Sequence, residues 1–84
     1  MNNSVDYPID YEAYSTEEII DLADFLGSLE QYHVNKVATN LIEKYERFQA
    51  ILNNKTEEKR IDQAFEKATG VSIFQTMKTI KEGQ

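Results

Sequence analysis

Apolar residues recur at every third or fourth position in four stretches of this chain, with polar residues between them. This spacing places the apolar side chains of each stretch on one face of an α-helix. The pattern predicts helices at residues 16–31, 36–52, 55–69 and 73–82. The core faces of the first two are Ile19, Leu22, Ala23, Leu26 and Leu29, widened by Ile20 and Phe25, and Val37, Leu41, Tyr45, Phe48 and Leu52, with Ala38, Ile42 and Ile51 beside them. Those of the last two are Ile61, Phe65 and Ala68, bordered by Ala64, and Ile73, Met77 and Ile80.

Three of these helices begin with residues that form capping boxes. A Ser or Asn side chain at the N-cap accepts from a free backbone N–H, and a Glu or Gln three residues later bonds back to the N-cap amide. The pairs with this spacing are Ser15 with Glu18, Asn54 with Glu57, and Ser72 with Gln75. Tyr14 and Ile19 add the spacing of a hydrophobic staple to the first pair.

Gly70 predicts the end of the third helix, because glycine readily takes the left-handed conformation that closes a helix. Val71 can then fold back on Phe65. Since Ser72 starts a new helix at once, helices 55–69 and 73–82 must cross steeply. The first connection is predicted at residues 32–35, with Asn35 capping the second helix. His33, the only histidine, is interpreted as an ordinary loop residue.

The N-terminal segment Tyr7–Tyr11 holds a proline, which favours extended backbone, and three large side chains. We expect it to pack over the helices; the alternative is an exposed aromatic peptide for a partner. Residues 1–6 are polar and are expected to be disordered. The predicted fold class is therefore all-α, a compact single-domain bundle of four helices spanning residues 1–84.

Several short motifs resemble those of the uncharacterised protein family 0223, small bacterial proteins best known from Gram-positive species. They are YPID at 7–10, STEE at 15–18, YERF at 45–48, EEKRIDQAF at 57–65 and TGVSIF at 69–74. The chain departs from the family pattern at Tyr14, where tryptophan is usual, and at Leu52-Asn53, where proline usually precedes the third helix. The resemblance implies an all-helical fold and a cytosolic setting, and it implies no activity.

Composition excludes several classes of protein. The chain has no cysteine for a disulfide or a thiolate metal site. It also lacks a run of ~20 apolar residues for a membrane span and a basic, apolar N-terminus typical of a signal peptide. Residues 1–35 hold eight acidic and no basic residues, within a net charge of −6. Such a half repels phosphate and argues against nucleic acid as a partner. These acidic residues either stabilise the first helix turn and keep the protein soluble, or form a docking surface for a basic partner.

No catalytic motif is present, and the glycines at 27, 70 and 83 stand too far apart for a phosphate-binding loop. Gly70-Val71-Ser72 resembles the turn of a DNA-binding helix-turn-helix. That motif, however, needs a small residue where this chain has Glu66, and a core residue where it has Thr76. The sequence thus favours neither an enzyme nor a nucleic-acid binder, and it indicates no cofactor and no small-molecule substrate.

Glu58, Asp62 and Glu66, here called the acidic stripe, follow one another at four-residue steps on the third predicted helix. Like charges at this spacing destabilise a helix slightly. Three interpretations stay open: a solvated face, an ion-pair set with Lys44, Arg47 or Lys59, or a surface for a partner or a metal. The candidate partner surface is Glu58, Lys59, Asp62 and Glu66.

These observations leave the biochemical function open and favour a small cytosolic protein-interaction module without catalytic activity, which binds another protein. The alternative is a homo-oligomeric structural protein.

Overall fold

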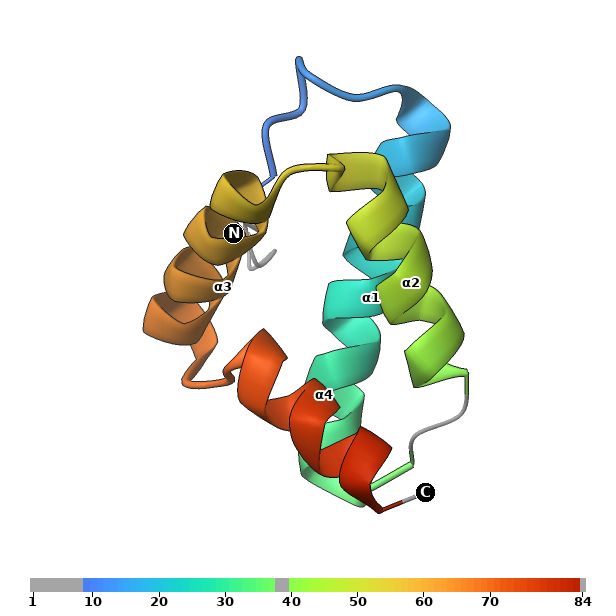
Figure 1. Ribbon diagram of the computed structural model, residues 1–84, viewed down its shortest axis with the longest axis vertical. Coiled ribbons are helices and arrows are strands. Elements are labelled where there is room, and N and C mark those ends of the chain that lie inside the picture. Colours follow the sequence, from blue (N-terminus) through green and yellow to red (C-terminus); the bar gives the residue numbers. More distant parts are fainter. Residues whose placement is uncertain (1–8, 38–39, 84) are drawn as a thin grey trace, which may run out of the picture.

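The computed structural model describes residues 9–37 and 40–83, which form four α-helices and no strand. The helices are α1 (Thr16–Asn35), α2 (Leu41–Leu52), α3 (Lys55–Thr69) and α4 (Ile73–Glu82) (Figure 1). The predicted all-α fold is confirmed. The predicted disorder of residues 1–6 and the predicted packing of Tyr7 and Pro8 lie outside the described residues.

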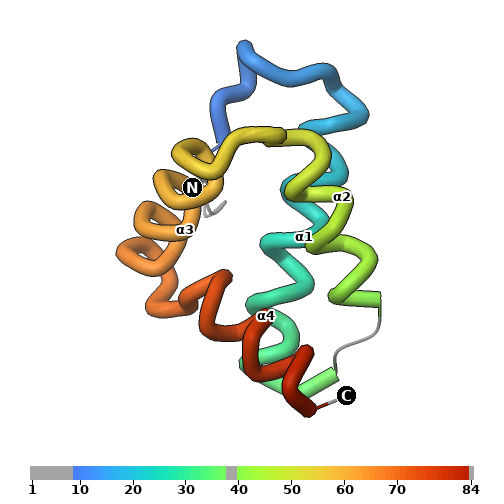
Figure 2. Tube along the Cα trace, viewed as in Figure 1, coloured from blue at the N-terminus to red at the C-terminus, as the bar shows by residue number. Residues whose placement is uncertain are grey.

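The helices are arranged around α2, which contacts each of the other three. In Figure 1, α1 and α2 run antiparallel side by side, α3 stands on the far side of the molecule from them, and α4 crosses steeply from the end of α3. The Cα trace in Figure 2 shows the tight turn between α3 and α4, after which α4 leaves at an angle. The steep crossing predicted from Gly70 and Ser72 is confirmed.

One hydrophobic core joins the four helices. The largest fully buried side chains are Phe25, Phe48 and Phe65, one each from α1, α2 and α3. The rings of Phe25 and Phe48 lie 4.9 Å apart between centroids, which holds α1 against α2. Ile9 is also buried, so this part of the N-terminal segment does pack on the bundle, whereas Tyr11 is exposed.

The first helix boundary was predicted wrongly. Residues 32–35 are the last turn of α1 rather than a loop, and α2 begins at Leu41 rather than Lys36. Lys36 closes α1 in the left-handed conformation at φ 62°, and its N–H donates to the Tyr32 carbonyl at 2.7 Å. Asn35 therefore does not cap α2. Val37 is exposed rather than in the core; Ala38, predicted beside it, lies outside the described residues.

Two other side chains lie outside the core faces on which they were predicted. Ile20 is 60% exposed on α1 and Ala68 is exposed on α3. Ile20 lies at the edge of the predicted stripe, where helix rotation decides burial, and Ala68 lies in the last turn of α3.

The N-cap side chains predicted for α1, α3 and α4 all accept backbone hydrogen bonds, but both arms of the capping box form only at Ser15 and Glu18. Ser15 and Glu18 form both arms of their capping box, and Ser72 Oγ accepts from the Gln75 N–H at 3.2 Å. Asn54 accepts from two amides at the start of α3. Glu57, however, does not bond back to Asn54 as predicted; Arg60 binds its carboxylate at 2.9 and 2.6 Å.

Two ion pairs join the outer surfaces of α1 and α2. Arg47 Nε lies 2.9 Å from Asp21 Oδ2, and Lys44 Nζ lies 3.1 Å from Asp24 Oδ2. These groups are partly solvent-exposed, so each pair contributes little stability.

No helix among residues 9–37 and 40–83 is long and apolar enough to cross a membrane.

Alanine at Gly70 is expected to lower the free energy of unfolding by about 1 kcal/mol. Gly70 has φ +80°, and no atom lies within 4 Å of the position that a Cβ would take, so the backbone conformation alone causes the loss. Gly83→Ala is the matched control, because Gly83 has φ −83° and room for a Cβ at 3.5 Å from its nearest neighbour. Urea unfolding of both variants is the measurement. Equal effects at the two sites would contradict this account of the α3–α4 turn.

Candidate functional site

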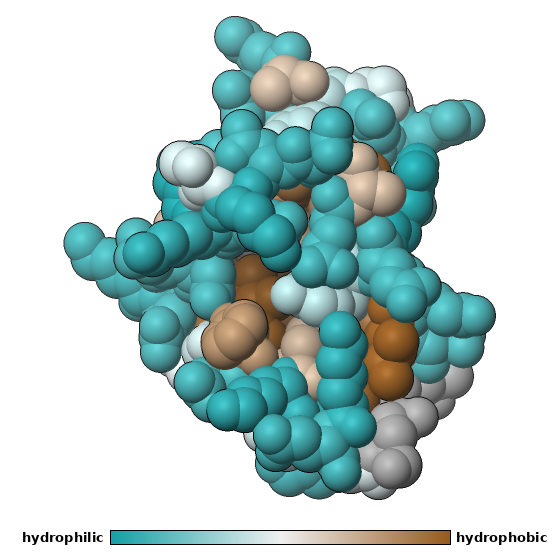
Figure 3. All heavy atoms as spheres, viewed as in Figure 1, coloured by the Kyte–Doolittle hydropathy of each residue, from teal (hydrophilic) through white to brown (hydrophobic). Residues whose placement is uncertain are grey.

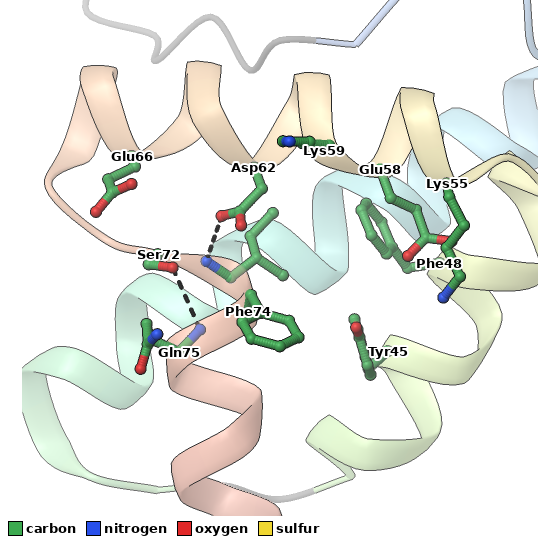
Figure 4. A pocket seen from close by; sticks show the side chains of 11 residues that line it. Tyr45, Phe48, Lys55, Glu58, Lys59, Asp62, Glu66, Ser72, Phe74 and Gln75 are labelled. Carbon is green, nitrogen blue, oxygen red and sulfur yellow. Dashed lines mark hydrogen bonds between the residues drawn. The ribbon is translucent and has the colours of Figure 1, made fainter.

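A cleft of about 510 Å³ opens between α3 and the facing parts of α2 and α4. All four residues of the predicted partner surface, Glu58, Lys59, Asp62 and Glu66, line it (Figure 4). The structure therefore brings these side chains to one concave site. The sequence indicated the α3 wall alone; the rest of the lining comes from elements that the sequence could not place opposite it.

The acidic stripe forms the α3 wall of the cleft. Figure 4 shows its three carboxylates pointing from α3 toward α2 and α4. Glu58 and Asp62 are half-buried, whereas Glu66 is exposed. Lys55 and Lys59 lie on the same wall, so the cleft is not uniformly negative.

Aromatic side chains from α2 and α4 form the opposite side of the cleft. Tyr45 and Phe48 come from α2, and Phe74 comes from the first turn of α4. Tyr45 is only 9% exposed, whereas Phe74 is 60% exposed. Sequence reasoning missed Phe74 as a functional residue. The available signal was its position, since it directly follows Ile73 and so falls off the apolar face formed by Ile73, Met77 and Ile80.

A second depression of about 310 Å³, the side hollow, adjoins the cleft. Tyr45 and Phe74 line both spaces, so they form the ridge between them. Met77, Lys78, Lys81 and Glu82 of α4 complete the side hollow. Figure 3 shows apolar surface exposed in the hollowed region framed by α2, α3 and α4, with hydrophilic side chains around it.

Asp62 has a structural role that the sequence did not reveal. Its Oδ1 accepts a hydrogen bond from the Ile73 N–H at 2.8 Å, and thus caps α4 from the wall of α3 (Figure 4). The interpretation of the whole stripe as a merely solvated face is wrong at this residue. The predicted pairing with Lys44 and Arg47 is wrong too, since both bind aspartates of α1.

The charges of the cleft act on the Tyr45 hydroxyl. Burial raises the pKa of Tyr45, and the nearby carboxylates of Glu58 and Asp62 raise it further. Tyr45 is therefore a neutral phenol at physiological pH, able to donate a hydrogen bond. Lys81 Nζ lies 5.0 Å from the centre of its ring, so a cation covers one face of this residue.

His33 lies elsewhere, at the end of α1, where its Nε2 is 2.9 Å from the hydroxyl of Thr76. It is thus a link between α1 and α4 rather than the loop residue that was predicted. In the described part of the chain, no group of three or more His, Cys, Asp or Glu side chains is arranged to hold a metal ion. The cleft presents aromatic rings, carboxylates and the ammonium groups of Lys55 and Lys59.

Comparison with known proteins identifies the family. The profile of the uncharacterised protein family UPF0223 matches residues 4–84. The chain belongs to UPF0223. A UPF0223 protein of Streptococcus uberis is 37% identical over 83 residues, which cover 98% of this chain and 89% of the relative. A UPF0223 protein of Streptococcus pneumoniae strain CGSP14 is 35% identical with the same coverage.

No solved structure matches this UPF0223 chain. The resemblance inferred from the YPID, STEE and EEKRIDQAF motifs is confirmed. Since UPF0223 is an uncharacterised family, membership brings no activity with it.

Replacing Asp62 is expected to separate its capping role from its charge. Asp62→Ala removes the acceptor of the Ile73 N–H and should lower the free energy of unfolding by about 1 kcal/mol. Asp62→Asn keeps an oxygen acceptor and relieves like-charge repulsion within the stripe, so it should cost less than half as much. Urea denaturation of the two variants is the measurement. If Asp62→Ala were as stable as the wild type, the capping role would be contradicted and Asp62 would be an ordinary solvated residue.

The raised pKa of Tyr45 predicts a pH dependence with a definite sign. The folded-state pKa of Tyr45 lies above the ordinary value of 10.0. The stability that the neutral phenol contributes is therefore fully present below pH 10 and is lost as pH rises through the folded-state pKa. The free energy of unfolding, measured for wild type and Tyr45→Phe, should differ by a constant amount up to about pH 9. Above pH 10 the wild type should lose stability faster than the variant. Parallel curves would contradict the described environment of the hydroxyl.

Proposed function

We propose that this UPF0223 protein is a cytoplasmic protein-interaction module without catalytic activity, and that its cleft holds a segment of another protein. The observation that carries the proposal is Phe74, a phenylalanine 60% exposed on the ridge between two concave surfaces. An aromatic ring left in water beside a cleft is typical of a residue that is buried when a partner binds.

The proposed partner segment carries an apolar side chain and at least one basic group. The apolar side chain packs on Phe74 and Tyr45, where aromatic surface is available for burial. The basic group faces the acidic stripe, whose free carboxylate oxygens accept from lysine or arginine. Carboxylates on this wall repel phosphate, so the proposal includes no nucleic acid.

The shape of the site favours a chain segment over a small molecule. Small-molecule sites enclose most of their ligand, whereas this cleft and the side hollow are open and share Tyr45 and Phe74 as lining residues. The cleft and the side hollow together are here called the groove. A peptide can follow such a groove and place successive side chains in the two spaces. A second copy of this chain is the alternative occupant and would make the protein a homo-oligomer.

The test is affinity capture from the cytosol of the organism that makes the protein, followed by calorimetry with the purified partner. Phe74→Ala is expected to weaken binding at least about tenfold, as for a central aromatic contact. Ile20→Ala is the matched control, because Ile20 is also 60% exposed but lies on α1, away from the cleft. It should leave the affinity unchanged.

Three outcomes would contradict the proposal. The first is a Phe74→Ala variant with wild-type affinity, and the second is an equal loss in Ile20→Ala. The third is wild-type self-association that Phe74→Ala abolishes in sedimentation velocity, which would establish the homo-oligomer instead.

A further inference from the structure

The groove has an opposite excess of charge on the two sides of Phe74. On one side lie the three carboxylates of the acidic stripe with Lys55 and Lys59, so acidic residues exceed basic ones by one. On the other side lie Lys78 and Lys81 with Glu82, so basic residues exceed acidic ones by one. Among residues 9–37 and 40–83, no ion pair joins the acidic stripe to Lys78 or Lys81. A ligand that crosses the ridge therefore meets negative charge at one end and positive charge at the other.

Resting on the proposed function, we propose that the groove selects a dipolar peptide segment. Its basic side chains face the acidic stripe, its apolar anchor packs on Phe74 and Tyr45, and its acidic side chains face Lys78 and Lys81. Charge complementarity of this kind determines which segments bind and how they are oriented, more than it determines how tightly they bind. A segment with two basic ends would place one of them against Lys78, and a segment with two acidic ends would place one against Glu66.

Contacts within the protein leave these charges available to a ligand. One carboxylate oxygen of Asp62 accepts a hydrogen bond from the Ile73 N–H, and Gln49 Nε2 lies 3.5 Å from one oxygen of Glu58. A carboxylate accepts several hydrogen bonds, so each retains acceptor capacity. Lys81 lies over the ring of Tyr45, which holds its charge at the edge of the side hollow. Glu66 lines the cleft and Lys78 lines the side hollow, and both are exposed.

The test is selection of random twelve-residue peptides displayed on phage, with wild-type protein as bait and Phe74→Ala as counter-selection. Peptides that depend on Phe74 are expected to carry an apolar centre with basic residues on one side and acidic residues on the other. The basic residues can lie at either the N-terminal or the C-terminal end of the peptide, because the groove selects for the separation of charge and not for the direction of the chain.

Charge-reversal variants then locate each end of the selected peptides. Lys78→Glu and Glu66→Lys should each weaken their binding about fivefold at low salt, and the effect should shrink as salt is added. Lys67→Glu and Glu43→Lys change the net charge equally at exposed positions outside the groove, and should have no effect. In a second selection, Lys78→Glu should favour peptides with two basic ends.

The outcomes distinguish this inference from the function on which it rests. Phe74-dependent peptides with one sign of charge, or with no charge pattern, would contradict the proposal that the ligand is dipolar. They would still support the proposal that the cleft binds a peptide segment. Absence of any Phe74-dependent peptide would overturn both. Selection of peptides that match this chain's own α3 or α4, together with self-association of the wild type, would replace the proposed ligand with a second copy.

Discussion

The carboxylate of Asp62 accepts a hydrogen bond of 2.8 Å from the first amide of α4, that of Ile73. The way α4 packs against α3 depends on this hydrogen bond. The first amides of a helix have no partner within the helix. Ser72 caps one of them locally, whereas the Ile73 N–H is bound by a residue of the preceding helix. Together with the left-handed Gly70, this contact fixes the steep angle at which α4 leaves α3. The same angle separates the two walls of the cleft and brings Phe74 to its edge.

The acidic stripe combines one carboxylate that stabilises the fold with two that are open to the cleft. Within the acidic stripe, Asp62 serves the fold while Glu58 and Glu66 face the open cleft. The repulsion among the three charges is small, and the α4 cap offsets part of it. Burying Phe74 in the core instead would require α4 to rotate and would expose Ile73 or Met77, which are both buried. The exposed ring is therefore a consequence of how α4 is held.

Most of the fold could be predicted from the sequence because its signals are local. Capping residues and three- to four-residue apolar spacing identified four helices and, for α3 and α4, both ends. The end of α1 was missed because Lys36 takes a left-handed conformation without glycine, and no local pattern marks that. The α3 wall of the site was found from its unusual charge spacing. The other wall could not be found, because Tyr45 and Phe74 meet α3 only through the packing of α2 and α4.

The central claim is that Asp62 holds α4 in place by binding the Ile73 amide, and hydrogen exchange of that amide measured by NMR tests it most directly. The account predicts that the Ile73 N–H of the wild type exchanges at least about tenfold more slowly than in an unstructured peptide. In Asp62→Ala this protection should be lost at Ile73 while the amides in the middle of α4 stay protected. Exchange of the wild-type Ile73 amide at the unstructured rate would contradict the account.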